Sequence, residues 1–300
     1  MENIIVEIQE TKALGLKEKL SAYFELTKPR IAFMLVLTAA AGFYLGSDKG
    51  FNWMLFTNSM FGIAILAFGV ATLNQYIERD TDALMERTAK RPLPSGRLSA
   101  NEALIFGSLL TIFSEIYLAY FVNGLTAILG LVVIVGYVFL YTPLKTKTSA
   151  STAIGALPGA LPPLMGFTAA ANEITLSAWV LFAMLFLWQF PHFLAIAWMY
   201  REEYAKAGIL MLPVVEPSGK LTMRQIVMFT IMLLPVSLAP FFFGISGPIF
   251  LTAAIVLGIL FLIASIQAAR AKTNEKAKRL LLASVIYLPL LFIFMVADKR

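Results

Sequence analysis

Nine long apolar stretches constrain the fold of this chain more than any other feature. The second of them runs from Trp53 to Leu73 without a charged side chain. A helix rises about 1.5 Å per residue, so a stretch of this length matches the roughly 30 Å hydrocarbon core of a bilayer. The predicted spans are 31–46, 53–74, 103–122, 125–142, 153–171, 177–200, 225–244, 248–269 and 281–296. The sequence therefore predicts an all-α, polytopic membrane protein with a bundle of nine transmembrane helices.

Composition and charge placement agree with this prediction. Of the 300 residues, 59% are hydrophobic and 14% are charged. With an odd number of spans and the N-terminus inside, 21 of the 24 lysines and arginines fall in inner segments, as the positive-inside rule requires. We therefore expect one membrane domain over residues 1–300, with a cytoplasmic N-terminal segment (1–25), a bundle (26–297) and the C-terminus outside. The net charge of +6 then reflects topology and an anionic substrate, and no nucleic-acid partner is expected.

Several classes of chemistry are excluded. The chain has no cysteine, which rules out disulfides, thiolate metal sites and thiol nucleophiles. It contains neither a Walker loop nor a dinucleotide-binding fingerprint. The N-terminal segment mixes acidic and basic residues, unlike a signal peptide or an arginine-rich transit peptide, and is compatible with a helix on the membrane surface. The expected location is a bacterial inner membrane.

The second span ends in a stripe of oxygen-bearing side chains. Asn74, Glu78 and Asp82 are spaced i, i+4, i+8, so they fall within roughly 80° on one helix face, whereas Asp80 points elsewhere. Basic residues crowd the same region: Arg79, Arg87, Lys90, Arg91 and Arg97. Hard oxygen ligands beside such groups suit a divalent cation that bridges to a phosphorylated substrate. The alternative is an ordinary helix end with a solvated, charged loop.

A second acidic cluster follows the sixth span. Glu202 and Glu203 precede Tyr204, and they are either part of a shared metal site or solvate a helix end. The only histidine, His192, lies 11 residues before Glu203, which predicts that it is about 16 Å deeper and nearly on the same helix face. It is either a functional group, including an axial ligand if the substrate contains iron, or a neutral histidine satisfied by a neighbouring helix.

Further polar residues lie close to or within the spans. Glu115, in the third span, is a proton relay, a substrate contact or, most readily, a protonated interhelical hydrogen-bond partner. The loop that follows Tyr141 contains Lys145, and Lys28 and Arg30 precede the first span. These three basic residues would add positive charge around an anionic headgroup.

The fifth span is the weakest of the nine. Its run of Gly and Pro from 155 to 163 permits either close helix contact or a broken helix. Close packing is the safer interpretation.

These motifs resemble the UbiA superfamily of intramembrane prenyltransferases. The Asn-xxx-acid-xxx-Asp stripe, the second acidic cluster and the nine spans carry the resemblance. Within the superfamily, segments in order from about residue 26 to 214 resemble the branch that farnesylates heme, most specifically Trp-Gln-Phe-Pro-His-Phe at 188–193 and Met-Leu-Pro-Val at 211–214. There are departures: Glu78 and the Glu202–Glu203 pair replace the family's aspartates, and Thr146 and Lys147 stand where arginines are expected.

The resemblance implies transfer of a farnesyl group from farnesyl diphosphate to a vinyl group of protoheme IX (heme b), giving heme O. It implies Mg²⁺ as the cofactor, with Asn74, Glu78, Asp82 and Glu203 as ligands and Glu202 as a further catalytic residue. The implied substrate contacts are Lys28, Arg30, Arg87, Lys90, Arg91, Tyr141, Lys145, His192 and Tyr204. The implied partners are membrane lipid and a downstream heme-modifying enzyme that receives the product.

Two other functions remain open at this point. A sister prenyltransferase would use a quinone precursor or another aromatic acceptor and would have no need of His192. A transporter or channel would use Glu115, His192 and the acidic clusters as a path. The acids lie together at one membrane face, which argues against a path through the bundle.

Overall fold

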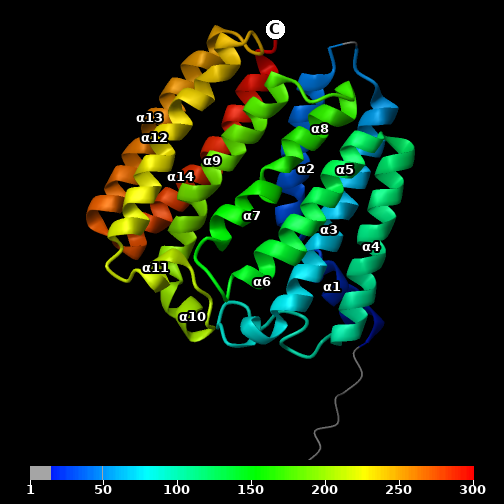
Figure 1. Ribbon diagram of the computed structural model, residues 1–300, viewed down its shortest axis with the longest axis vertical. Helices are drawn as coiled ribbons and strands as arrows, with labels where there is room; N and C mark the ends of the chain where they lie inside the picture. The colour runs from blue at the N-terminus through cyan, green and yellow to red at the C-terminus, as the bar shows by residue number, and fades with distance from the viewer. Residues whose placement is uncertain (1–14, 49) are drawn as a thin grey trace, which may run out of the picture.

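The helices of this protein lie side by side and form one bundle. The computed structural model describes residues 15–48 and 50–300. Within these ranges, nine helical segments are long and apolar enough to cross a membrane. Figure 1 shows them running along the long axis of the molecule, with short helices at one end and the C-terminus at the other. The first 14 residues of the predicted cytoplasmic segment, and Lys49, lie outside the described residues.

The nine predicted spans are confirmed, with shifted boundaries. Three short helices, α1 (Leu16–Leu26), α10 (Arg201–Lys206) and α11 (Leu212–Val215), lie at the end of the bundle that we call the inner end (Figure 1). The spans are α2 (Pro29–Gly46), α3 (Trp53–Ala83), α4 (Ala100–Phe121), Gly124–Leu144, Ser151–Ala171, α9 (Leu176–Met199), α12 (Lys220–Phe242), α13 (Pro248–Ala271) and α14 (Asn274–Ala297).

Some spans run beyond their predicted ends. The helix of α3 continues to Ala83 rather than ending at residue 74, so it carries the whole oxygen stripe. Helix α14 likewise begins at Asn274, where Thr273 caps it, rather than at residue 281. Hydropathy measures only the apolar part of a helix, and a helix continues into the polar interface as long as its backbone stays hydrogen-bonded.

The Gly- and Pro-rich fifth span is both broken and closely packed. Its two parts, α7 (Ser151–Gly159) and α8 (Leu161–Ala171), meet at Ala160, where two prolines follow within the first turn of α8. A methyl group added at Gly42 of α2 would overlap the backbone carbonyl of Pro163, and one added at Gly166 would overlap that of Ala39. The backbones of α2 and α8 are therefore in contact. The sequence analysis favoured close packing over a broken helix, and the structure shows both in this span.

The fourth span contains a π-helix, which the sequence analysis did not predict. Helix α5 (Gly124–Ile134) continues as η1 (Val135–Tyr141) and ends in the single turn α6 (Thr142–Leu144). Gly155 of α7 packs against the ring of Tyr141, which leaves no space for a side chain at that position. A π-turn changes the direction of the residues that follow it, and such turns are frequent at functional sites.

The sequence predicts one continuous helix from His192 to Glu203, but the structure interrupts this helix. Helix α9 stops at Met199, and Tyr200 leaves helical geometry with φ −108° and ψ 20° before α10 begins. The prediction that His192 and Glu203 share one helix face is therefore wrong, because a bend at Tyr200 separates them.

The last residues of the chain close the end of the bundle opposite α1. A side-chain oxygen of Asp298 accepts a hydrogen bond from the backbone N–H of Phe250 in the first turn of α13 (2.8 Å). Lys299 donates to the Tyr44 carbonyl at the end of α2 (2.9 Å) and pairs with Asp48 (3.0 Å). The C-terminus thereby ties together helices that are distant in the sequence.

Replacing Asp298 with alanine is expected to lower the free energy of unfolding by about 1–2 kcal/mol, because an acceptor and a negative charge are lost at the N-terminus of α13. The matched control is Asp48→Ala, which removes an exposed partner of Lys299 and is expected to cost less than about 1 kcal/mol. Denaturation of the detergent-solubilised protein measures both values. Equal losses would contradict a capping role for Asp298.

Candidate functional site

Asn74 joins three helices at the inner end of the bundle. It is buried, and its side-chain oxygen accepts a hydrogen bond from the Lys28 ammonium (2.8 Å). Its amide nitrogen donates to the hydroxyl of Thr142 (3.1 Å), which in turn donates to the Tyr137 carbonyl within the π-helix (2.8 Å). The sequence analysis missed Thr142, although this residue lies between Tyr141 and Lys145, which were both predicted as substrate contacts.

The two carboxylates of the stripe are each paired with a cation from another segment. Glu78 accepts from the Lys145 ammonium (2.6 Å), and Asp82, with 2% of its side chain exposed, accepts from the Arg91 guanidinium (2.6 Å). Burial opposes the charge of Lys145, but Glu78 and the neighbouring tyrosines outweigh it, and the pKa of Lys145 is raised well above its ordinary value. These two ion pairs and the hydrogen bond from Lys28 to Asn74 place three basic side chains along one oxygen stripe.

Lys28 occupies an unusual backbone position at the start of α2. Its φ of 48° and ψ of 58° lie in the left-handed region, which costs a residue with a side chain about 1 kcal/mol or more. Burial, and secondarily the nearby Arg91, lower the pKa of Lys28 to about 7. This conformation at the junction of α1 and α2 places the ammonium group against Asn74 of α3.

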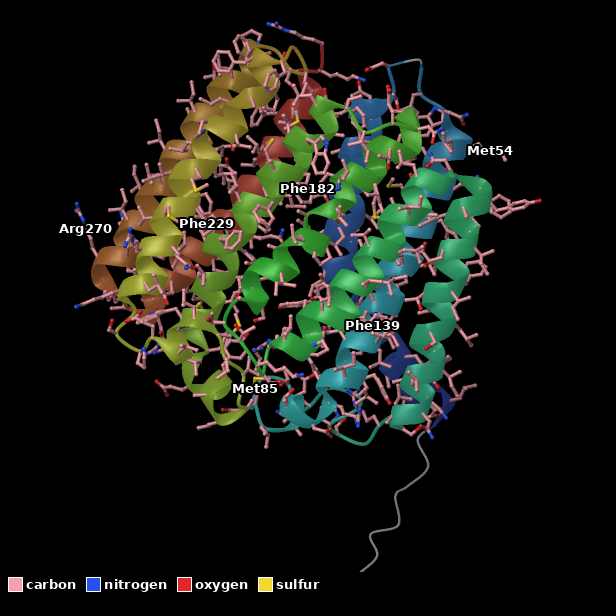
Figure 2. The ribbon with its side chains drawn as sticks, viewed as in Figure 1. Met54, Met85, Phe139, Phe182, Phe229 and Arg270 are labelled. Carbon is pink, nitrogen blue, oxygen red and sulfur yellow. The ribbon has the colours of Figure 1, made fainter. Side chains whose placement is uncertain are left out.

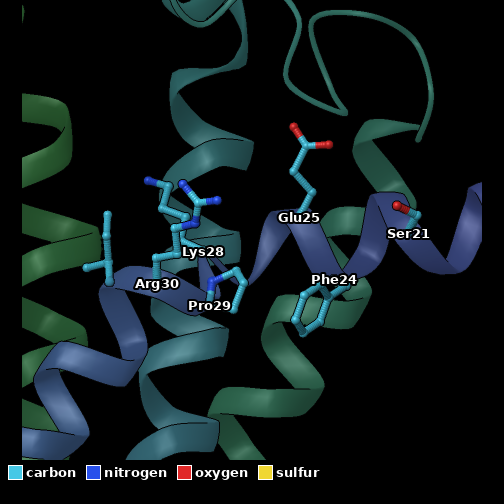
Figure 3. Close-up of a pocket in the computed structure, with 7 residues that line it drawn as sticks. Ser21, Phe24, Glu25, Lys28, Pro29 and Arg30 are labelled. Carbon is cyan, nitrogen blue, oxygen red and sulfur yellow. The ribbon is translucent and has the colours of Figure 1, made fainter.

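A depression of about 470 Å³ lies beside this junction. Figure 3 shows Lys28 and Arg30 projecting to the same side of it, with Phe24 and Glu25 of α1 along its border. Arg30 is exposed in the depression, whereas Lys28 reaches the stripe.

Arg87 connects the loop after α3 to the second acidic cluster. Its backbone N–H donates to Glu203 (3.1 Å), and its guanidinium donates to the Tyr204 hydroxyl (3.5 Å) and lies 5.0 Å from the ring centre of Tyr200. Burial is the main reason that the pKa of Tyr204 is raised. Glu202 points away from this cluster, with 84% of its side chain exposed.

Small apolar contacts hold the inner loops in place. Met85, labelled in Figure 2 near α10, packs with a group of buried residues from the end of α9 and the loop after α10: Ala197, Ala207, Ile209 and Met211. The backbone N–H of Leu210 donates to the carbonyl of Lys145 (2.8 Å). The loops that carry Arg87 and Lys145 thus contact the segment around α10, which carries Glu203.

Of the other predicted substrate contacts, one lies beside the stripe and one is exposed to solvent. The ring centre of Tyr141 lies 4.5 Å from the ammonium nitrogen of Lys145, so Tyr141 belongs to the stripe region. Lys90 is exposed, and its carbonyl accepts from Arg97 (2.7 Å). Thr146 and Lys147, at the positions where the resemblance predicts arginines, are also exposed.

The oxygen atoms of the stripe suit a divalent metal ion that takes its remaining ligands from a substrate. Over residues 15–48 and 50–300, no three histidine or acidic side chains lie close enough together to hold a metal, so Glu203 does not join Glu78 and Asp82 in one cluster. Two carboxylates and the Asn74 amide nevertheless share one face of α3. Mg²⁺ is commonly held by one or two carboxylates together with substrate phosphates and water, which fits these residues.

His192 and Glu115, the two ionisable residues singled out within the predicted spans, differ in their surroundings. Nδ1 of His192 contacts the hydroxyl of Ser284 on α14 (2.8 Å), and the ring stacks on Trp188, so a neighbouring helix satisfies one of the two ring nitrogens. Both side-chain oxygens of Glu115 are buried and have no hydrogen-bond partner among the described residues; the side chain packs against Gly130 of α5. The preferred interpretation of Glu115 as an interhelical hydrogen-bond partner is therefore wrong.

Together, the fold and site define a multi-pass membrane protein with a buried, charge-paired polar site at one end of an apolar helical bundle. The sequence model of the UbiA prenyltransferase family matches residues 35–294. The chain belongs to this family.

Relatives agree with the assignment, and solved structures share the fold. A protoheme IX farnesyltransferase from Solibacter usitatus is 47% identical over 286 residues, covering 92% of this chain and 98% of the relative. One from Salinibacter ruber is 44% identical over 276 residues, with the same coverage. The structure of a digeranylgeranylglyceryl phosphate synthase superposes with a TM-score of 0.76 at 19% identity, covering 94% of this chain and 98% of the other. A UbiA homologue from Archaeoglobus fulgidus, bound to GPP and Mg²⁺, has a TM-score of 0.65 at 17% identity, covering 92% and 99%.

Proposed function

We propose that this protein transfers the farnesyl group of farnesyl diphosphate to a vinyl group of protoheme IX, giving heme O. The family supplies the reaction class, and the relatives named protoheme IX farnesyltransferase supply the acceptor. The observation that carries the proposal is the stripe of Asn74, Glu78 and Asp82, in which each residue bonds a different basic side chain.

The stripe is suited to a leaving diphosphate. An allylic carbon releases diphosphate only if the growing negative charge is stabilised. Mg²⁺, held by Asn74, Glu78 and Asp82, supplies such stabilisation when it is bound. Lys28, Lys145 and Arg91 already point to this place and can donate charge-assisted hydrogen bonds to phosphate oxygens. The apolar bundle above them excludes water from the farnesyl cation until that cation has added to the vinyl group. Water then captures the resulting cation on the heme and supplies the hydroxyl of heme O.

The distribution of basic residues supports a particular orientation of the protein in the membrane. The basic residues at the inner end of the bundle favour an orientation with that end and α1 on the cytoplasmic side of a bacterial inner membrane, where a soluble diphosphate headgroup is accessible. The farnesyl chain then lies among the apolar spans. The farnesylated heme leaves as a membrane-bound product, ready for a downstream heme-modifying enzyme.

The test uses purified protein in detergent or lipid with farnesyl diphosphate, protoheme IX and Mg²⁺. We expect a farnesylated, hydroxylated heme by mass spectrometry, and its loss when EDTA is added. A prenylated quinone precursor or other aromatic acceptor, with protoheme left unchanged, would assign the protein to a sister prenyltransferase. Absence of pyrophosphate release with every acceptor would exclude prenyl transfer.

Replacing Lys145 with methionine is expected to lower the rate about 100-fold and to raise the KM for farnesyl diphosphate, because Glu78 loses its cation and the diphosphate loses a donor. The matched control is Lys147→Met, which removes an exposed charge two residues away. Initial rates over a range of farnesyl diphosphate concentrations measure both effects. Equal kinetics for the two variants would remove Lys145 from the site.

A further inference from the structure

Ser284 of α14 hydrogen-bonds the side-chain rings of Trp188 and His192 on α9. Its backbone carbonyl accepts a hydrogen bond from the indole N–H of Trp188 (2.9 Å), and its hydroxyl oxygen lies 2.8 Å from Nδ1 of His192. The two rings stack, with centres 4.6 Å apart and an angle of 24° between their planes. Ser284 is completely buried. One residue therefore fixes the position of both side chains.

The hydrogen bonds of Ser284 also decide which nitrogen of His192 carries the proton. The Ser284 hydroxyl donates to the carbonyl of Leu281 (2.6 Å), and a carbonyl can only accept. The hydroxyl proton is thus in use, so Ser284 accepts from His192, and Nδ1 is the protonated nitrogen. In the neutral ring, the lone pair then lies on Nε2.

The position of His192 on α9 leaves its ring partly accessible. Gln189 faces α7, where its amide donates to the Ala156 carbonyl (3.0 Å), and Trp188 faces α14. At about 100° per residue, His192 projects between these two directions. Its side chain is half-buried, whereas Ser284 beside it is fully enclosed. Nδ1 is the enclosed side of the ring.

We propose that Ser284 is a positioning residue that keeps Nε2 of His192 free as a ligand for the iron of the substrate porphyrin. This inference rests on the proposed function for the identity of the acceptor. A histidine that ligates a metal usually donates its other ring N–H to a fixed acceptor, which sets the tautomer and the ring orientation. Coordination of the iron by Nε2 would fix the porphyrin, and with it the reacting vinyl group, relative to α9. The stacked Trp188 keeps the ring from turning.

The experiment measures heme binding rather than turnover. Ferric protoheme IX is titrated into the purified full-length protein, and the absorption and resonance Raman spectra of the ferric and reduced forms report the axial ligand. We expect the wild-type spectrum to show a histidine ligand that is lost in His192→Ala. Ser284→Ala is expected to weaken heme binding about tenfold or more and to shift the iron–histidine vibration, because Nδ1–H loses its acceptor.

Two further variants separate positioning from general damage to the bundle. Ser237→Ala removes another buried hydroxyl that bonds α14, through Tyr287 (2.7 Å), and is expected to leave the heme spectrum unchanged. Ser284→Cys keeps a weaker acceptor of similar size and is expected to give an intermediate shift.

The outcomes are distinct for the two proposals. If heme binds but the spectrum is the same in Ser284→Ala and wild type, or in His192→Ala and wild type, the role of Ser284 is overturned while heme farnesylation stands. If wild-type protein neither binds nor farnesylates heme, both proposals are overturned. An equal spectral shift in Ser237→Ala would also overturn the inference, since the effect would then belong to the helix interface.

Discussion

Replacing Asp82 with asparagine is expected to lower the rate of heme farnesylation at least about 100-fold. The substitution removes a charge from the stripe and keeps the size of the side chain, so an oxygen stays beside Arg91 while the metal and the diphosphate lose a carboxylate. The matched control is Asp80→Asn on the same helix. Asp80 points off the stripe with 83% of its side chain exposed, and its replacement is expected to change the rate by less than about twofold. Initial rates of farnesylated heme formation measure both.

The Asp82 variant also needs a test of folding. Breaking a buried ion pair leaves the partner charge unpaired, which can cost several kcal/mol. Size-exclusion chromatography and denaturation of the variant show whether the bundle is intact. An intact Asp82→Asn protein with full activity and unchanged Mg²⁺ dependence would show that the stripe is structural and not catalytic.

The largest effect on stability is expected at the contact between α2 and α8. Gly166→Val would drive a branched side chain into the backbone carbonyl of Ala39, and backbone yields less readily than a side chain. We expect a loss of more than about 3 kcal/mol in the free energy of unfolding, or failure to accumulate in the membrane. Thermal or denaturant unfolding in detergent measures the loss.

The control for this substitution is Gly124→Val at the start of α5. A side chain added there meets no atom within 4 Å. The same valine is therefore expected to change stability by less than about 1 kcal/mol. If the two variants were equally stable, the close contact of α2 and α8 would not be needed by the bundle.

The sequence by itself determined the nine spans, the face shared by Asn74, Glu78 and Asp82, and the basic residues that surround them. Each of these follows from a local property: the length of an apolar stretch, the 100° turn of a helix, or the charge count between spans. Such properties do not depend on how the helices pack against one another. The resemblance to the family could be read from short segments for the same reason.

The tertiary structure alone decided which groups meet. Lys28 bonds Asn74 across 46 residues, Lys145 bonds Glu78 across 67, and His192 meets Ser284 across 92. The direction in which helices pack sets these pairs, and hydropathy carries no information about it. The π-helix before Thr142 and the bend at Tyr200 are also visible only in the tertiary structure. A few residues with altered backbone geometry leave the apolar pattern of the sequence unchanged, so the pattern cannot predict them.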